Sequence, residues 1–473
     1  MNSPRVIRAA HATMVLSLVL ATVLPVTLPV AAQQAAQQAP QRLAPPPAQP
    51  PAQPPQVISY AEALRLALQR NVTVRQAQAT VESNAIAASQ ARRNLLPDFR
   101  FNTSGAESYG RNFNQSDGQI VNRTIQTLNA GVSSGVTLFD GKRSLASIRQ
   151  AESNATASEQ DAARTRQTAL YTVAANYVAM VAQREQLTVR EQALAAQRGL
   201  EAQVQAFVDA GTRSIADLYA QQAAVASANL DVVQARRALE LARLEIIRTL
   251  QLDPAGNYDF TAPPLTDTAT TPPLDSLIAR ALAHRADLTA QVSRLQAANA
   301  AVNAASATRW PTLSLSLGYN TSYSSVSDFG FVDQLDQRRG GSVSLGFSLP
   351  IFDKFSTRSA TQQATIQLEN ARLALEKQRL EVGLEVRQAW LDLTSAREQL
   401  VAAEAQQRSA EMALTASRER YQAGAATLVE LAQARATQVQ AATALVNARY
   451  NLILQQTVVA YATGALDAST MMP

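Results

Sequence analysis

The chain of 473 residues contains no cysteine and only two histidines, His11 and His284. Without cysteine it can form no disulfide, no thiolate metal site and no lipid anchor attached through sulfur. With so few histidines, sites built from several histidines or from a thiol–histidine pair are excluded as well. A glycine-rich phosphate-binding loop is also lacking. We therefore expect a protein that is not an enzyme and that holds no cofactor or metal ion.

Aromatic residues are scarce too, at 5% of the chain, whereas apolar residues reach 47%. A large buried area is therefore possible without the aromatic content of a compact enzyme. Alanine and glutamine are abundant, which suits helices that pack side by side at short distance. The formal net charge of +5 is spread along the chain without a basic block, so no nucleic-acid partner is expected.

The N-terminal residues have the pattern of a secretory signal. Arg5 and Arg8 precede an apolar run over residues 12–30, which leads into small residues. A membrane anchor is the alternative, but the run contains proline and is not followed by basic residues. We predict a signal peptide over residues 1–32, with cleavage near Ala32.

The next segment, residues 33–56, consists almost wholly of proline, glutamine and alanine. Such a composition cannot bury apolar surface and predicts an extended, disordered linker. No later stretch is apolar over the roughly 20 residues that a spanning helix needs. We therefore expect any membrane crossing by the later residues to use strands.

The remainder of the chain is an internal duplication with an offset of 214 and then 213 residues. We predict a first repeat over residues 59–261, a proline-rich linker over 262–273, a second repeat over 274–464 and a C-terminal tail over 465–473. Six matches occur in the same order in both repeats: Ala67-Leu68 with Ala281-Leu282, Leu96-Pro97 with Trp310-Pro311, Phe139-Asp140 with Phe352-Asp353, Tyr177 with Trp390, Asp209-Ala210-Gly211 with Gln422-Ala423-Gly424, and Asp217-Leu218 with Glu430-Leu431.

Each repeat is predicted to contain a helix, two strands and a long helical hairpin. The strands are expected at about 98–109 and 125–139, and at about 311–323 and 341–351. From Leu313 to Tyr319, apolar residues alternate with serine and glycine. This alternation is typical of a strand with one face toward lipid and the other toward water. A half-buried sheet of a soluble protein shows a similar pattern.

The hairpins are predicted from two proline-free stretches, about 142–209 and 355–422. As unbroken helices these would be roughly 100 Å long. Their turns are expected at 210–217 and 423–430. Asp140 and Asp353 precede the two stretches and are expected to bond free N–H groups at the helix starts. Heptad spacings occur on more than one stripe, which indicates neighbours on both sides, as in a helical cylinder.

The number of strands bears on assembly. Four strands cannot close a barrel. An open strand edge in lipid leaves backbone N–H and C=O groups without hydrogen-bond partners, and each such group costs several kcal/mol of free energy. Two copies would give a filled eight-stranded barrel, whereas three give twelve strands and room for a pore. We therefore predict a homotrimer with a transmembrane β-barrel joined to a long α-helical barrel of coiled-coil hairpins.

The duplicated layout resembles the TolC family of outer-membrane efflux proteins. The resemblance covers nearly all of residues 59–464 and also rests on the turns Phe207–Gln222 and Arg420–Arg435 and the ending Ala448–Gly464. It implies a trimer with a twelve-stranded barrel in the cell outer membrane and a helical cylinder that crosses the periplasm.

The resemblance also implies a periplasmic adaptor and an inner-membrane pump as partners, with the chain as a passive exit duct for small molecules. Type I protein secretion, which uses the same fold, remains an alternative within the family. From a different class, a periplasmic coiled-coil structural protein without a pore also remains.

The candidate functional residues lie at the two hairpin turns. By resemblance, the turns form the periplasmic tip that receives the adaptor, and the docking surface would comprise Gly211, Ile215, Leu218, Gly424, Leu428 and Leu431. A family pair of acidic residues at the constriction corresponds here to Glu430 and Gln433, so that only one position is acidic. Asp217 is the first-repeat counterpart, and Arg213 is expected to latch the closed tip by pairing with Asp217 or Glu430. Solvated acids at helix starts are the simpler alternative.

Overall fold

The computed structural model describes residues 56–114, 118–122, 124–261 and 272–467, all within one compact unit, Pro54–Pro473. The predicted signal peptide and residues 33–55 of the predicted linker lie outside the described residues. The same holds for residues 262–271 of the second linker and 468–473 of the tail.

The two repeats contain helices of identical length, which is the structural mark of the duplication. The pairs are α1 (Tyr60–Arg70) and α5 (Leu274–His284) with 11 residues, α2 (Val72–Arg93) and α6 (Ala286–Ala307) with 22, α3 (Arg143–Asp209) and α8 (Ser356–Gln422) with 67, and α4 (Ile215–Thr249) and α9 (Leu428–Ala462) with 35.

Each repeat has two helices before its strands, where we predicted one. The first pair breaks at Asn71, whose Oδ1 accepts hydrogen bonds from the N–H groups of Thr73 and Val74 at 2.9 and 3.3 Å. Such a side-chain cap stabilises a new helix start. Arg285 occupies the corresponding break between α5 and α6. Neither proline nor glycine marks either break, so the sequence pattern runs across it.

The starts of the two longest helices agree with the prediction for Asp140 and Asp353. One carboxylate oxygen of Asp140 accepts a hydrogen bond from the N–H of Ser144 at 2.8 Å, and Asp353 accepts one from Thr357 at 2.9 Å. Each carboxylate therefore satisfies a free N–H group in the first turn, where the helix dipole also favours negative charge.

Four strands form one antiparallel sheet in the order β2-β5-β7-β8. Their bounds are β2 (Arg100–Ser108), β5 (Ile125–Phe139), β7 (Thr312–Ser324) and β8 (Gly340–Ser348). β8 ends three residues before the predicted limit because Pro350 has no N–H to give to a sheet. Within the described residues, β2 and β8 each pair on one side only, so both outer edges of the sheet are open.

One face of this sheet presents apolar side chains to its surroundings. Phe101 lies opposite Val132 and Val132 opposite Tyr319, so the three share a face, and they are 71%, 47% and 55% exposed. Across the next strand pair this face continues through Val343, Leu345 and Phe347, all exposed. A contiguous exposed apolar face of this kind marks a surface that meets lipid or another protein.

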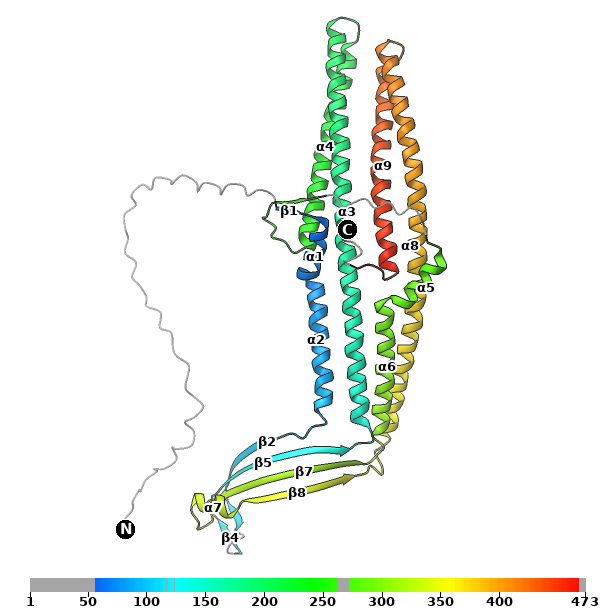
Figure 1. Ribbon diagram of the computed structural model, residues 1–473. Coiled ribbons are helices and arrows are strands. Elements are labelled where there is room, and N and C mark those ends of the chain that lie inside the picture. Colours follow the sequence, from blue (N-terminus) through cyan, green and yellow to red (C-terminus); the bar gives the residue numbers. More distant parts are fainter. Residues whose placement is uncertain (1–55, 115–117, 123, 262–271, 468–473) are drawn as a thin grey trace, which may run out of the picture. The chain divides into compact units, whose positions relative to one another are not determined.

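Several small elements were not predicted. The loop between β2 and β5 contains a hairpin of β3 (Arg111–Asn114) and β4 (Gln119–Asn122), and the loop between β7 and β8 contains the short helix α7 (Phe331–Gln337). Both lie at the end of the sheet that is far from the helices (Figure 1).

A second unpredicted feature is the parallel pair of β1 (Gln56–Ile58) and β6 (Tyr258–Phe260). Tyr177 of α3 lies beneath it, fully buried, with its hydroxyl within hydrogen-bonding distance of the carbonyl oxygens of Ile58 and Thr261. This contact connects the start of the first repeat and the segment that follows its last helix to α3.

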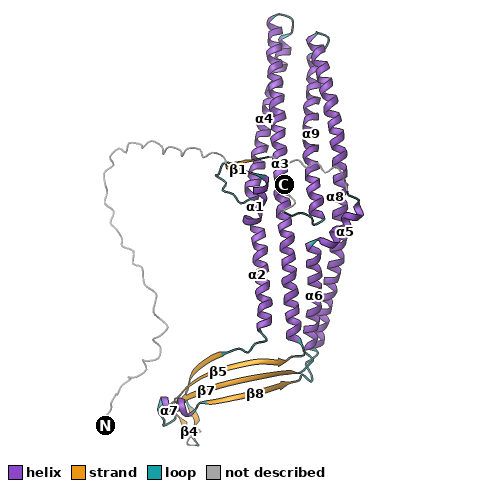
Figure 2. Ribbon diagram, viewed as in Figure 1, coloured by secondary structure: helices purple, strands orange, loops and turns teal. Residues whose placement is uncertain are grey.

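The long helices run side by side (Figures 1 and 2). Next to the sheet the neighbours are α2, α3, α6 and α8, and farther away they are α4, α3, α9 and α8. Thus α3 and α8 extend along both halves, whereas α4 ends near the start of α2 and α9 ends near the start of α6. Each half is a row of four helices.

A buried ionic joint connects the end of α9 to the start of α6. Arg285 is 3% exposed, pairs with Asp287 at 2.6 Å and Glu385 at 2.5 Å, and donates to the carbonyl oxygen of Ala462 at 3.1 Å. Burial tends to raise the pKa of Asp287, but the hydrogen bonds and charge of Arg285 outweigh it and lower that pKa below its ordinary value. The cation also complements the negative end of α9.

Candidate functional site: the tips of the two helical hairpins

Both hairpin turns close with glycine in the left-handed conformation. Gly211 and Gly424 each have φ of 72°. The N–H of Gly211 bonds to the carbonyl oxygen of Val208 and that of Thr212 to Phe207, both at 2.9 Å. The second turn repeats this arrangement, which satisfies the last carbonyl groups of a helix and favours glycine because a side chain is strained there.

The helices that leave the two turns are capped by hydroxyl groups. Ser214 accepts a hydrogen bond from the N–H of Ala216 at 3.0 Å, and Thr427 accepts one from Glu430 at 3.2 Å. The Glu430 carboxylate in turn lies 3.2 Å from the Thr427 hydroxyl. Asp217 likewise stands in the first turn of its helix, where the dipole favours a negative charge.

The two tips pack against each other through a common apolar cluster. Leu218, Leu428 and Leu431, which we predicted as docking residues, are 4%, 9% and 1% exposed and lie inside this cluster. Its buried members are Leu200, Val204, Leu218, Tyr421, Ala426, Leu428 and Leu431. These three leucines therefore hold the hairpins together within one protomer and are not a free surface, because the other hairpin covers them.

The accessible part of the predicted docking surface is smaller. Gly211, Gly424 and Ile215 remain exposed, the last at 53%. Two further apolar side chains, Tyr219 and Val429, are 63% and 77% exposed beside them. These two were missed because the sequence pattern does not show which side of each helix the other hairpin covers.

The charged residues at the tips are arranged differently from the predicted latch. The Arg213 guanidinium lies over the ring of Tyr421, 4.9 Å from its centroid, and so joins the first turn to the end of α8. Glu430 pairs instead with Arg420, at 3.6 Å, within the second hairpin. Gln433 is exposed. Burial, partly offset by Arg213, raises the pKa of Tyr421 above its ordinary value.

A buried polar network lies between the hairpins, farther from the tips, and we did not predict it from the sequence. Arg435 is 9% exposed and donates from Nη1 to the carbonyl oxygen of Ala196 at 2.8 Å. Its other contact, Gln197 Oε1, also accepts from Gln221. Through these residues α9 is bonded to α3 and α3 to α4. An arginine within an alanine-rich helix face is the only hint that the sequence offers.

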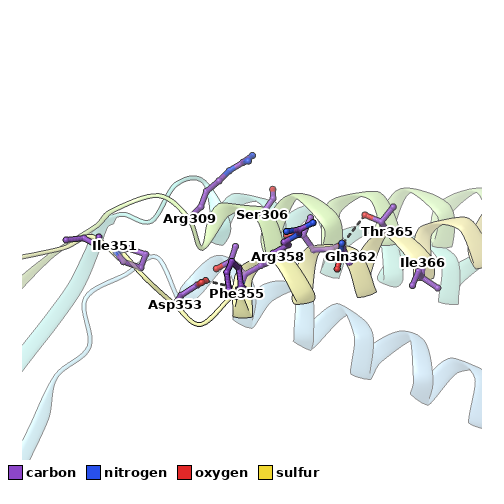
Figure 3. A pocket seen from close by; sticks show the side chains of 12 residues that line it. Ser306, Arg309, Ile351, Asp353, Phe355, Arg358, Gln362, Thr365 and Ile366 are labelled. Atoms are coloured by element: carbon purple, nitrogen blue, oxygen red, sulfur yellow. Dashed lines mark hydrogen bonds between the residues drawn. The ribbon is translucent and has the colours of Figure 1, made fainter.

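No other chemical site emerges from the described ranges. Among them, no cluster of three or more histidine, cysteine or acidic residues is placed to hold a metal ion. In the same ranges, no helix is both long and apolar enough to cross a membrane. One hollow lies at the sheet end of α8 and has a volume of about 870 Å³ (Figure 3).

Duplicated helical hairpins of this length, joined to a four-stranded sheet with an exposed apolar face, define an export-channel type of fold. The chain belongs to the outer membrane efflux protein family, whose model matches residues 63–250 and 277–465, one match in each repeat. The protein is therefore located in the cell outer membrane, with its helical hairpins in the periplasm, and the predicted TolC-like relationship is confirmed.

Individual relatives agree with this assignment. Protein CyaE of Bordetella pertussis is 28% identical over 343 residues, which cover 72% of this chain and 70% of the relative. Outer membrane protein TolC of Vibrio cholerae is 26% identical over 395 residues, with 82% and 86% covered. Outer membrane efflux protein BepC of Brucella suis is 24% identical over 350 residues, with 74% of each covered.

Solved structures share the fold. The CmeC outer membrane channel of Campylobacter jejuni superposes with a TM-score of 0.75 at 19% identity, covering 87% of this chain and 88% of that one. VceC of Vibrio cholerae gives 0.76 at 19% identity, with 86% and 96% covered.

Proposed function

We propose that three copies of this chain join their sheets into one closed barrel of twelve strands and form a passive exit duct. The open edges of β2 and β8 carry this proposal. A strand edge within lipid leaves its N–H and C=O groups without partners, at several kcal/mol for each group. Pairing β8 of one copy with β2 of the next removes both edges, and three copies are the fewest that leave a pore.

The exposed apolar face supports the same arrangement. Side chains such as Phe101 and Phe347 are about two-thirds exposed in the single chain. On the outside of a barrel they would contact acyl chains, while the serine- and glycine-rich face would line water. The helical hairpins would then continue the duct through the periplasm as a cylinder.

The duct would receive small molecules from an inner-membrane pump through a periplasmic adaptor. The similarity to BepC of Brucella suis, an outer membrane efflux protein, supports efflux as the function. The accessible tip residues Gly211, Gly424, Ile215, Tyr219 and Val429 would be the surface that meets the adaptor.

The tip would also be the gate. Arg213 on Tyr421 holds the two hairpins together, and Asp217, Glu430 and Gln433 lie beside this contact or on the following helix turns. A ring of three Glu430 carboxylates would narrow the duct if the tips converge. The two turns differ in these residues although their backbones are alike, so one hairpin can hold its position while the other moves.

The test is the assembly and conductance of the purified full-length protein. In detergent, native mass spectrometry should give three copies, and insertion into planar lipid bilayers should give discrete conductance steps. A protein that stays monomeric and gives no conductance would overturn the proposal. Deletion of the gene should raise the intracellular content of an efflux substrate; loss of a secreted protein instead would indicate type I secretion.

A further inference from the structure

We propose that α2 of one copy lies along α8 of the next in the register that α6 takes along α3 within one copy, so that Ile86 meets Ile366 of the second copy. This inference rests on the proposed assembly and specifies the surface between its copies. It is argued from the duplication, because in a closed ring of duplicated units the contact between copies occupies the position equivalent to the contact between the two repeats of one copy.

The open sides of the helical row are those of α2 and α8. Next to the sheet the order is α2-α3-α6-α8, so α3 and α6 have neighbours on both sides, whereas α2 and α8 have one each in the described residues. α2 corresponds to α6 and α8 to α3. The contact of α3 with α6 is therefore the internal template for a contact of α8 with α2 of a second copy.

Each of these two helices has an exposed apolar stripe. On α2, Val72 and Ile86 lie two heptads apart and are 45% and 70% exposed. On α8, Ile366, Leu373 and Leu380 follow each other at intervals of seven residues and are 59%, 53% and 65% exposed. Seven-residue spacing keeps these side chains on one stripe, as in a coiled coil. Two matching stripes on two open sides are suited to cover each other.

The register follows from residue correspondence. α3 begins at Arg143 and α8 at Ser356, an offset of 213, while α2 begins at Val72 and α6 at Ala286, an offset of 214.

Within the copy, Ser153 of α3 and Ala300 of α6 line the same hollow between these helices. With these two offsets, Ser153 of α3 corresponds to Ile366 of α8, and Ala300 of α6 corresponds to Ile86 of α2. Small residues at the internal contact are thus replaced by two exposed isoleucines at the contact between copies. The replacement has a physical reason, because only separate chains need added apolar area to associate.

Near the sheet, the contact between copies is expected to be less closely packed than the contact of α3 with α6 within one copy. Within the copy, Gly141 lies so close to Trp310 that a Cβ on the glycine would be 2.5 Å from the Trp310 Cβ. The counterparts are Lys354 and Leu96, and lysine carries a Cβ, so the same approach cannot be repeated between copies. The hollow in Figure 3 lies within one copy, between the end of α6 and the first turns of α8, and Ile366 lines the end of it that is farther from the sheet.

Engineered disulfides test the register, since the native chain contains no cysteine. The full-length double variant I86C/I366C is oxidised in outer-membrane vesicles and run on a non-reducing gel. The matched control is I86C/L373C, which displaces the second cysteine by one heptad on the same stripe. That shift is about 10 Å, beyond the Cα separation of roughly 7 Å that a disulfide tolerates.

Covalent dimers and trimers should form with I86C/I366C at about five-fold or more the yield of the control, because only the first pair is within reach. Equal yields, or a higher yield for I86C/L373C, would overturn the register. If native mass spectrometry shows trimers without cross-links in I86C/I366C, this inference fails while the proposed assembly stands. A monomeric mass would overturn both.

Discussion

The contact between Arg213 and Tyr421 makes the proposed gate testable by substitution. The Tyr421 ring is 1% exposed and Arg213 lies over it, half-buried. A cation over an aromatic ring contributes about 0.5–1 kcal/mol when exposed and about 2 when desolvated, so we take about 1 kcal/mol for each copy. Arg213→Ala should therefore weaken the closed packing of the two hairpins by this amount.

In a trimer whose three tips open together the effects add to about 3 kcal/mol, and at about 1.4 kcal/mol for each factor of ten the ratio of open to closed channels rises roughly 100-fold. The assay is the open probability of single channels in planar bilayers, for the wild type and Arg213→Ala side by side.

Two control variants sharpen the measurement. Tyr421→Phe keeps the ring, and the buried Tyr421 hydroxyl has no hydrogen-bond partner among the described residues, so this variant should gate like the wild type. Glu430→Ala removes only an exposed pair with Arg420 and should raise the conductance or reduce block by divalent cations, with a smaller change in open probability. If Arg213→Ala leaves the open probability unchanged, or Tyr421→Phe raises it equally, the contact does not hold the gate.

Three further substitutions probe the scaffold, each followed by thermal unfolding in detergent. Asp287→Asn should lower the free energy of unfolding by about 3 kcal/mol at neutral pH, because it leaves the buried Arg285 short of a charge partner. The folded-state pKa of Asp287 is lowered, so the stabilisation that its carboxylate gives is full above the ordinary pKa of 3.8 and is lost as the pH falls through the lower folded-state pKa. The stabilities of the variant and the wild type should therefore converge in acid. Tyr177→Phe should cost about 1–2 kcal/mol by removing the hydroxyl that bonds to the β1 and β6 segments, and an unchanged melting temperature would contradict that role. Gly424→Ala should cost about 1–2 kcal/mol through the left-handed backbone alone, since open space surrounds the position, and a cost near zero would show that the turn relaxes.

The elements with strong local signals could be predicted from the sequence. The 67-residue helices follow from the absence of proline, and the turns follow from Gly211 and Gly424 at equivalent places. The sheet strands follow from alternation, with errors of up to three residues at their ends. In each case the physical cause acts within a few residues of the chain, so a single sequence contains it.

Features that depend on distant partners could not be predicted. The pairing of β1 with β6 joins three-residue strands about 200 residues apart, and neither strand is long enough to have a periodicity of its own. The burial of Leu431 depends on the other hairpin, so its apolar character did not show whether it packs or docks. Arg435 likewise finds neutral oxygen partners on α3, which no spacing along α9 reveals.

The joint at Arg285 lies at the base of the second hairpin, far from its tip, so that a small rotation at the joint becomes a large displacement at the tip. α9 extends 35 residues from this joint to the tip, an arm of about 50 Å at 1.5 Å per residue. A rotation of only about six degrees at the joint would carry the tip through about 5 Å, the rise of one helical turn. The Arg285 joint lies about midway along the long helices, distant from both the sheet and the tip. A wide movement at one end of the molecule therefore requires little rearrangement anywhere along its length.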